Sequence, residues 1–153
     1  MKRLFAVVAA LALAAGIASA QDFNAAVEKT GGAHRAASAG RAAFPGETIS
    51  RHAGEVMAQN GIDASLFRSR QVSRYLLEEA DLVIGMTRSH RESLVSAAPE
   101  FAPKIRELGE WRSGKGISDP FGGGAAVYEK AFAAIKEAVD ALLREIGEKE
   151  ARP

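Results

Sequence analysis

The chain has 153 residues, of which 47% are hydrophobic and 25% are charged, values that are ordinary for one soluble globular domain. Its 20 basic and 19 acidic residues give a formal net charge of +1, which excludes the concentrated basic charge of a nucleic-acid-binding face. The sequence contains no cysteine, and this excludes a disulfide, a thiolate metal site and a thiol nucleophile.

The N-terminus follows the pattern of an export signal. Lys2 and Arg3 are basic, residues 4–18 are apolar, and Ala18-Ser19-Ala20 is a small-x-small cleavage site. The apolar run is short for a membrane span. In this interpretation residues 1–20 are removed, and the mature protein is periplasmic or secreted without an integral membrane span.

The next part of the chain predicts three helices before the apolar run over 82–86. A short helix is expected over 22–29, then a short strand over 34–37 and a turn at Pro45-Gly46. Helical spacing of apolar residues begins near Thr48 and ends at Asn60-Gly61. Ser73 is the expected N-cap of a further helix that reaches Ala80.

The C-terminal half continues the alternation of strands and helices. Its expected elements are a buried strand over 82–86, a helix over 87–97, an outer strand over 104–108, a glycine-rich loop over 111–124 and a helix over about 125–146. The last helix has one apolar stripe, formed by Val127, Ala131, Ile135, Ala138, Val139 and Leu142. This alternation predicts a single α/β domain with a mostly parallel sheet.

Five short segments, in this order and spacing, resemble one enzyme family. They are Ser38-Ala39-Gly40, Gly61-Ile62-Asp63-Ala64-Ser65, Arg68-Ser69-Arg70-Gln71, Ala80-Asp81-Leu82-Val83-Ile84-Gly85-Met86 and Asp119-Pro120-Phe121-Gly122-Gly123. Over about residues 22–147 the chain is similar to low-molecular-weight protein-tyrosine phosphatases, including their arginine-phosphatase branch, and residues 148–153 form a polar tail. The resemblance implies a three-layer, phosphotyrosine protein phosphatase I-like sandwich with a four-stranded parallel sheet in the order 2-1-3-4. It also implies a protein carrying phosphotyrosine or phosphoarginine as partner.

The resemblance assigns roles to three residues. Asp119 corresponds to the general acid that protonates the leaving group, and Phe121 corresponds to an aromatic residue that lines the substrate cleft. Phe44 lies where the family has an aromatic wall beside its phosphate loop. The plainer alternative is that Asp119 only begins a turn before the last helix. The three dispersed histidines have no metal-site spacing, and the sequence gives no sign of a metal or organic cofactor.

The phosphate loop of the family, Cys-x5-Arg-Ser/Thr, is missing. Counting back from Ser38 without gaps, its cysteine would fall near Ala12 and its arginine near Ala18, within the sequence ALAAGIAS. The thiolate attacks phosphorus and the arginine binds two phosphoryl oxygens, so the standard mechanism cannot operate here. Phe67 also replaces the histidine that the family places before Arg68-Ser69-Arg70-Gln71, although Arg68 and Arg70 could simply be surface residues near Glu78 and Glu79.

The apolar N-terminal segment therefore has a second interpretation, as the family's first strand over 4–11 followed by a degraded loop. The protein would then be cytoplasmic, and cleavage after Ala20 would remove the middle of the sheet. The sequence leaves three hypotheses for function. They are a phosphatase homologue with impaired catalysis, an exported binding or interaction domain on the same scaffold, and a chain whose N-terminus is not native through a wrong start, a frameshift or a fusion.

Overall fold

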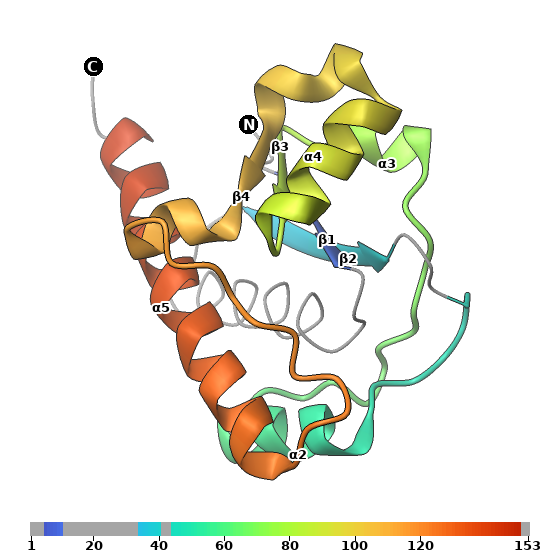
Figure 1. The fold of residues 1–153 in the computed structure, drawn as a ribbon, viewed down its shortest axis with the longest axis vertical. Coiled ribbons are helices and arrows are strands. Elements are labelled where there is room, and N and C mark those ends of the chain that lie inside the picture. Colours follow the sequence, from blue (N-terminus) through green and yellow to red (C-terminus); the bar gives the residue numbers. More distant parts are fainter. Residues whose placement is uncertain (1–4, 11–33, 41–43, 151–153) are drawn as a thin grey trace.

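The computed structural model describes residues 5–10, 34–40 and 44–150, the first of these ranges by its backbone alone. The helix predicted over 22–29 and the expected positions of the phosphate-loop cysteine and arginine lie outside these residues. Within them the chain forms a parallel sheet with helices on both faces (Figure 1). The α/β class predicted from the alternating elements is confirmed.

The described sheet has four parallel strands in the order β2-β1-β3-β4. They are β1 (Phe5–Ala10), β2 (Arg35–Gly40), β3 (Leu82–Gly85) and β4 (Ile105–Glu107). The backbone of β1 pairs with β2 on one side and with β3 on the other. Residues 5–10 of the signal-like apolar segment are thus the inner strand of the described sheet.

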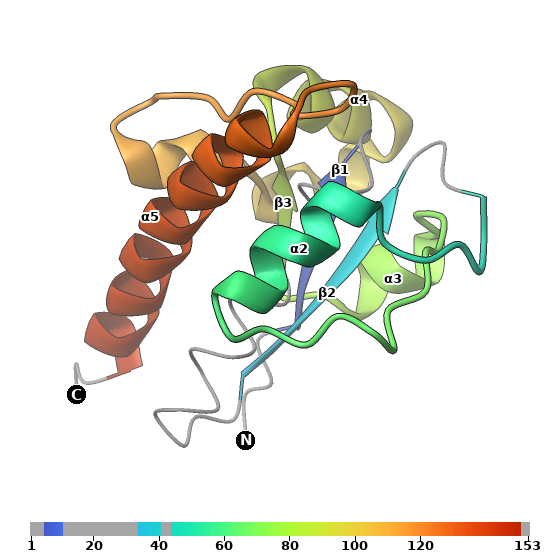
Figure 2. The same ribbon diagram turned by 90° about the horizontal axis from the view of Figure 1, so that it is seen from below.

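Helices cover the two faces of the sheet in pairs (Figure 2). One face carries α2 (Arg51–Gln59) and α5 (Ala125–Glu150), and the other carries α3 (Arg74–Glu79) and α4 (Arg88–Ala97). Adjacent residues of β3 supply the two cores, because Ile84 packs with α2 and α5 whereas Val83 packs with α3 and α4. This division explains the continuous apolar run in the sequence, since a strand covered on both faces has no polar side.

Two predicted helix starts are confirmed by their caps. The hydroxyl of Ser73 accepts a hydrogen bond from Leu76 N at 3.3 Å, and that of Thr87 accepts one from His90 N at 3.3 Å. At the end of β3, Gly85 lets α4 approach closely: a Cβ there would lie 2.7 Å from Arg91 N. The β3–α4 connection is therefore tight.

The structure differs from the sequence predictions at the C-terminal elements. A 3-10 helix, η1 (Pro99–Lys104), precedes β4, and a second, η2 (Leu108–Arg112), includes Trp111, which was expected in the glycine-rich loop. The last helix reaches Glu150 rather than about Ile146.

The apolar stripe predicted for α5 is wrong at its first member. Val127 is 45% exposed, whereas Tyr128 and Phe132 are buried in that part of the helix. Val127 instead lies against Gly123, where an added Cβ would come within 2.8 Å of its side chain. Helical spacing located the stripe but could not show that the first turn is packed against the preceding loop.

No helix among the described residues is long and apolar enough to cross a membrane.

Candidate active site

The carboxyl edge of the sheet is the natural place for a site in this fold. All four described strands are parallel, so β1, β2, β3 and β4 end at the same edge, at Ala10, Gly40, Gly85 and Glu107. Ligands of open α/β sheets bind in the crevice outside these ends. The expected cysteine position, residue 12, comes two residues after the end of β1 in the sequence and lies outside the described residues.

Asp119 begins a turn that leaves its carboxylate exposed. Its Oδ1 accepts a hydrogen bond from Phe121 N at 2.9 Å, and Gly123 N donates to Pro120 O at 2.9 Å. Gly122 has a φ of 79°, which favours glycine. The turn predicted as the plainer role of Asp119 is therefore present, and it holds the carboxylate beside Phe121 without burying it. An acidic group so placed is able to meet a ligand from solvent.

Buried residues anchor the loop that carries Asp119. Ile117 and Pro120 are both buried, and between them Ser118 and Asp119 are exposed. At the end of η2, before the loop, the Arg112 side chain pairs with Glu137 of α5 at 2.9 Å. It also donates to the carbonyls of Lys115 and Gly116, each at 3.3 Å. The loop predicted from its glycines is thus exposed at Asp119 but fastened on both sides.

The two aromatic residues assigned to the cleft are among the most exposed apolar side chains described. Phe44 is 74% exposed and Phe121 is 82% exposed. The structure brings Phe121 and Asp119 together in one turn, whereas Phe44 lies on a separate loop between β2 and α2. Exposed rings of this kind have little packing in the protein itself and are available to a ligand.

Sequence reasoning missed a residue that holds the Phe44 loop. Ser69 is buried, and its hydroxyl donates to Phe44 O and accepts from Glu47 N at 2.8 Å. Its backbone forms two more bonds, from Ser69 N to Glu47 O and from Gly46 N to Ser69 O, both at 2.8 Å. Its place between two arginines gave no signal for this role, because the partners are backbone groups more than twenty residues away.

The segment around Ser69 also joins the end of β2. Gly40 N donates to Arg70 O and Val72 N donates to Gly40 O, both at 2.9 Å, while Arg70 Nε donates to Ser38 O at 2.8 Å. Partial burial lowers the pKa of the Arg70 guanidinium, which stays charged at neutral pH. Arg70 is nonetheless an exposed residue, which agrees with its interpretation as a surface residue, and its side chain also binds the backbone of β2 at Ser38 O.

Phe67 and Arg68 behave differently from Arg70. Phe67 is partly buried and packs against the core on the α2 and α5 face. Arg68 is exposed and donates to the nearby carbonyls of Phe67 at 2.6 Å and Ser65 at 3.1 Å. At the position where the resemblance places a polar support for the phosphate loop, this chain has an apolar core contact.

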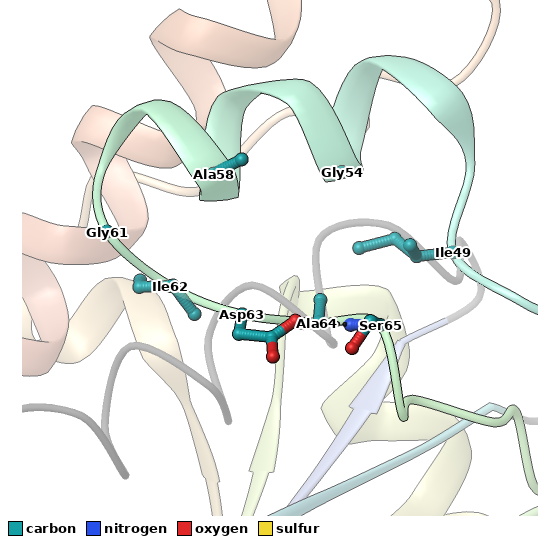
Figure 3. A pocket seen from close by; sticks show the side chains of 8 residues that line it. All are labelled: Ile49, Gly54, Ala58, Gly61, Ile62, Asp63, Ala64 and Ser65. Atoms are coloured by element: carbon teal, nitrogen blue, oxygen red, sulfur yellow. Dashed lines mark hydrogen bonds between the residues drawn. The ribbon is translucent and has the colours of Figure 1, made fainter.

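A cavity of about 490 Å³ lies beside α2 (Figure 3). Its lining is Ile49, Gly54, Ala58, Gly61, Ile62, Asp63, Ala64 and Ser65. The Asp63 carboxylate accepts from Ser65 N at 2.9 Å, and this bond lowers its pKa. The segment 61–65 that carried part of the resemblance therefore forms a turn and one wall of this mostly apolar space. Among the residues described, no group of three or more acidic, histidine or cysteine side chains could hold a metal ion.

Comparisons with known proteins agree on one family. The model of "Low molecular weight phosphotyrosine protein phosphatase" matches residues 14–152. A protein-arginine-phosphatase from Geobacillus stearothermophilus is 34% identical over 111 residues, which are 71% of this chain and 74% of the relative. A low molecular weight protein-tyrosine-phosphatase from Salmonella typhi is 26% identical over 117 residues, 76% of this chain and 78% of the relative.

Solved structures of similar proteins share the fold. A low molecular weight protein tyrosine phosphatase from T. tengcongensis superposes with a TM-score of 0.88 and 32% identity, covering 94% of this chain and 99% of the other. An arginine phosphatase from Geobacillus stearothermophilus gives a TM-score of 0.86 and 27% identity, with 98% of both chains covered.

Proposed function

Because this chain belongs to the low molecular weight phosphotyrosine protein phosphatase family, we propose that it is a phosphomonoesterase homologue whose catalysis is impaired by the loss of its phosphate loop. The observation that carries the proposal is the complete absence of cysteine from the 153 residues. The associated ligand class is a phosphorylated protein, since the similar proteins are named protein-arginine- and protein-tyrosine-phosphatases.

The missing groups are those that perform the chemistry. A thiolate must attack phosphorus while an arginine neutralises the phosphoryl oxygens, and alanine at positions 12 and 18 supplies neither group. An alcohol without a neighbouring base is a poor nucleophile at neutral pH, so Ser19 is no replacement. The end of β1 at Ala10 supports the assignment of position 12, because the family's loop follows its first strand.

The rest of the cleft is retained in this proposal. Asp119 serves as the general acid, held in an exposed turn, and Phe121 and Phe44 line the opening from two separate loops. Phe67 supports the proposed loss of the phosphate loop, because it packs into the core at the position where a polar support for that loop would be expected. The loss of function is thus confined to one loop and its support.

We also propose that residues 5–10 serve as the inner strand of the working protein. The pairing of β1 with both β2 and β3 supports this role over that of a cleaved leader. The apolar N-terminal run ends at Ala18-Ser19-Ala20, which has the pattern of a signal-peptide cleavage site. This pattern favours the second candidate, an exported binding domain without catalysis. The two candidates differ in whether residues 21–153 fold alone.

A loop restoration tests the proposed function. The native chain should show no vanadate-sensitive hydrolysis of p-nitrophenyl phosphate at any pH. The double substitution Ala12→Cys and Ala18→Arg recreates Cys-x5-Arg-Ser with the native Ser19 and should restore turnover. In that background Asp119→Asn should lower kcat by about 10²-fold or more, the usual contribution of a general acid.

The matched control for the restored chain is Ala12→Ser with Ala18→Arg, which has the arginine and no thiol. It should remain inactive while keeping the circular dichroism spectrum of the native protein. Vanadate-sensitive turnover by the native chain would overturn the claim of impaired catalysis. A folded Ala12→Cys, Ala18→Arg protein that stays inactive when Phe67→His is added would contradict the claim that the loss is confined to the loop and its support.

A further inference from the structure

A single buried hydroxyl lies beneath the exposed aromatic residue on the β2 side of the candidate site. Ser69 is only 3% exposed and belongs to the irregular segment between α2 and α3. Figures 1 and 2 show this segment running beside the one that leads from β2 into α2. A buried hydroxyl must find hydrogen-bond partners, so its choice of partners fixes whatever backbone provides them.

Among the residues that the structure describes, the hydrogen-bond partners of Ser69 belong to the 44–47 loop. The hydroxyl donates to Phe44 O and accepts from Glu47 N at 2.8 Å, so it bridges the two ends of the loop. The backbone of Ser69 pairs with Gly46 N and Glu47 O, each at 2.8 Å. These four bonds enclose the turn at Pro45-Gly46, where Gly46 has a φ of 88°.

The ring of Phe44 has few other means of support. With 74% of its surface exposed, it gains little from packing inside the protein. Its location is therefore set by the backbone that carries it, and the Phe44 carbonyl is one of the two loop groups held by the Ser69 hydroxyl. The two backbone bonds of residue 69 would persist in any side-chain variant, so a variant that lacks the hydroxyl tests its hold on the Phe44 carbonyl separately from those bonds.

We propose that Ser69 is a positioning residue for ligand recognition: its hydroxyl fixes the 44–47 loop and, through it, the Phe44 side of the opening. The inference rests on the proposed function for the contact between Phe44 and an aryl phosphate. Ser69 itself touches no ligand, and it acts through the loop. The consequence is that Ser69 affects recognition of the aryl group and leaves the chemical step unchanged.

Amide hydrogen exchange on the full native chain tests the loop itself. Ser69→Ala removes the acceptor of Glu47 N, and exchange at that amide should accelerate about tenfold, as expected for loss of one hydrogen bond. The Gly46 amide keeps its bond to the Ser69 carbonyl and should change less. Ser69→Thr retains the hydroxyl and should restore protection at Glu47.

Ser73→Ala is the matched control. It removes another serine hydroxyl from the same segment, one that caps α3 through Leu76 N and does not contact the 44–47 loop. It should leave the exchange of Glu47 unchanged, so a general loss of stability is separated from a local effect. Unchanged exchange at Glu47 in a folded Ser69→Ala protein would overturn the proposal.

Steady-state kinetics in the Ala12→Cys, Ala18→Arg background test the link to Phe44. Ser69→Ala should raise KM for p-nitrophenyl phosphate about threefold to tenfold, the range of one aromatic contact, and leave kcat within about twofold. Phe44→Ala should have a similar effect. Combining the two should add little to either, because both act through the same ring.

The hydrogen-exchange experiment and the kinetic experiment together separate failure of this proposal from failure of the proposed function. Additive effects of Ser69→Ala and Phe44→Ala on KM would overturn the role of Ser69 in positioning Phe44. A restored chain without turnover would instead count against the proposed function, and the exchange at Glu47 would then decide the role of Ser69 alone. Rescue by Ser69→Thr in both arms would support the hydroxyl as the group responsible.

Discussion

The two sides of the candidate site are held in place by different chemistry. Phe44 lies on a loop fastened by hydrogen bonds to Ser69, whereas Asp119 lies on a loop fastened by the buried residues Ile117 and Pro120. The hydrogen bonds that hold the Phe44 loop depend on direction, because hydrogen bonds weaken steeply when their angle changes. The packing that holds the Asp119 loop depends on volume, because truncating a buried side chain opens a cavity and its neighbours lose their contacts.

This difference separates what can change without unfolding the protein from what cannot. Loss of the Ser69 hydroxyl removes a directional constraint while the backbone bonds of the loop remain. Loss of Ile117 would remove a part of the core on the α2 and α5 face. The Phe44 side is therefore expected to be the adjustable side of the opening, and the Asp119 side the rigid one.

The largest expected effect comes from removing residues 1–20, because both sides depend on the sheet. The fragment 21–153 lacks β1, so β2 and β3 lose the strand that joins them. Unpaired strand edges and an open core should leave the fragment without a cooperative thermal transition by circular dichroism. A fragment as stable as the full chain would contradict this and would favour the exported binding domain.

The next effect concerns the Asp119 side alone. Ile117→Ala should lower the free energy of unfolding by about 2–5 kcal/mol, the usual cost of truncating a buried isoleucine. Urea denaturation of the full chain measures it. Val127→Ala is the matched aliphatic control, because Val127 is 45% exposed, and its cost should stay below about 1 kcal/mol. Equal costs for the two variants would show that the loop is not anchored at Ile117.

The same distinction separates the features that could be predicted from the sequence from those that could not. A continuous apolar run predicted a strand over 82–86, which the structure shows as β3 (Leu82–Gly85). The cap Ser73 and the helix expected over 87–97 predicted the starts of α3 and α4, since burial and caps are local properties of the chain. Asp119 and Phe121 were assigned from one contiguous motif, and the structure shows that they share a turn. The catalytic role of Asp119 stays a prediction.

Other features depended on contacts that are distant in the sequence. Ser69 lies beside two arginines, and nothing in that neighbourhood indicates a bond to Phe44 O, 25 positions away. Val127 fits the apolar stripe of α5, but its side chain lies against Gly123 rather than in the core. Burial is therefore predictable from the sequence where one apolar partner can replace another. A hydrogen bond to one particular backbone group is not predictable in this way.

A smaller effect is expected from the polar contact that reinforces the Asp119 side. Arg112→Ala removes the pair with Glu137 and the bonds to Lys115 O and Gly116 O. We expect a loss of about 1–2 kcal/mol in the free energy of unfolding, because the arginine is largely buried but Glu137 is exposed.

The matched variant for Arg112→Ala is Arg112→Lys, which keeps the charge and loses the planar fork. It should recover only part of the difference in urea denaturation, because an ammonium group cannot reach both carbonyls and Glu137 with the same geometry. Full recovery by lysine would show that the charge alone matters, and would argue against the bonds to the loop backbone.

The smallest effect is a pH dependence at the contact between η2 and the C-terminal part of α5. Lys149 and Trp111 donate to the Glu145 carboxylate, at 2.5 and 2.8 Å, and these bonds lower its pKa in the folded protein. A lowered folded pKa adds stability above the pKa of the unfolded state, and that stability is lost as the pH falls through the folded pKa. Because the carboxylate is partly exposed, we expect less than about 1 kcal/mol.

Trp111 is the sole tryptophan, so its fluorescence reports this contact directly. As the pH falls below the ordinary range of a glutamate, the emission of the native protein should shift while the protein is still folded, because the neutral carboxyl binds the indole N–H less strongly. Glu145→Gln should abolish the shift. The Ser69 bonds involve groups that do not titrate in this range, so exchange at Glu47, corrected for its intrinsic pH dependence, should stay constant. If Glu47 lost its protection together with the fluorescence change, the Phe44 loop and the contact between Trp111 and Glu145 would be one coupled unit rather than two independent ones.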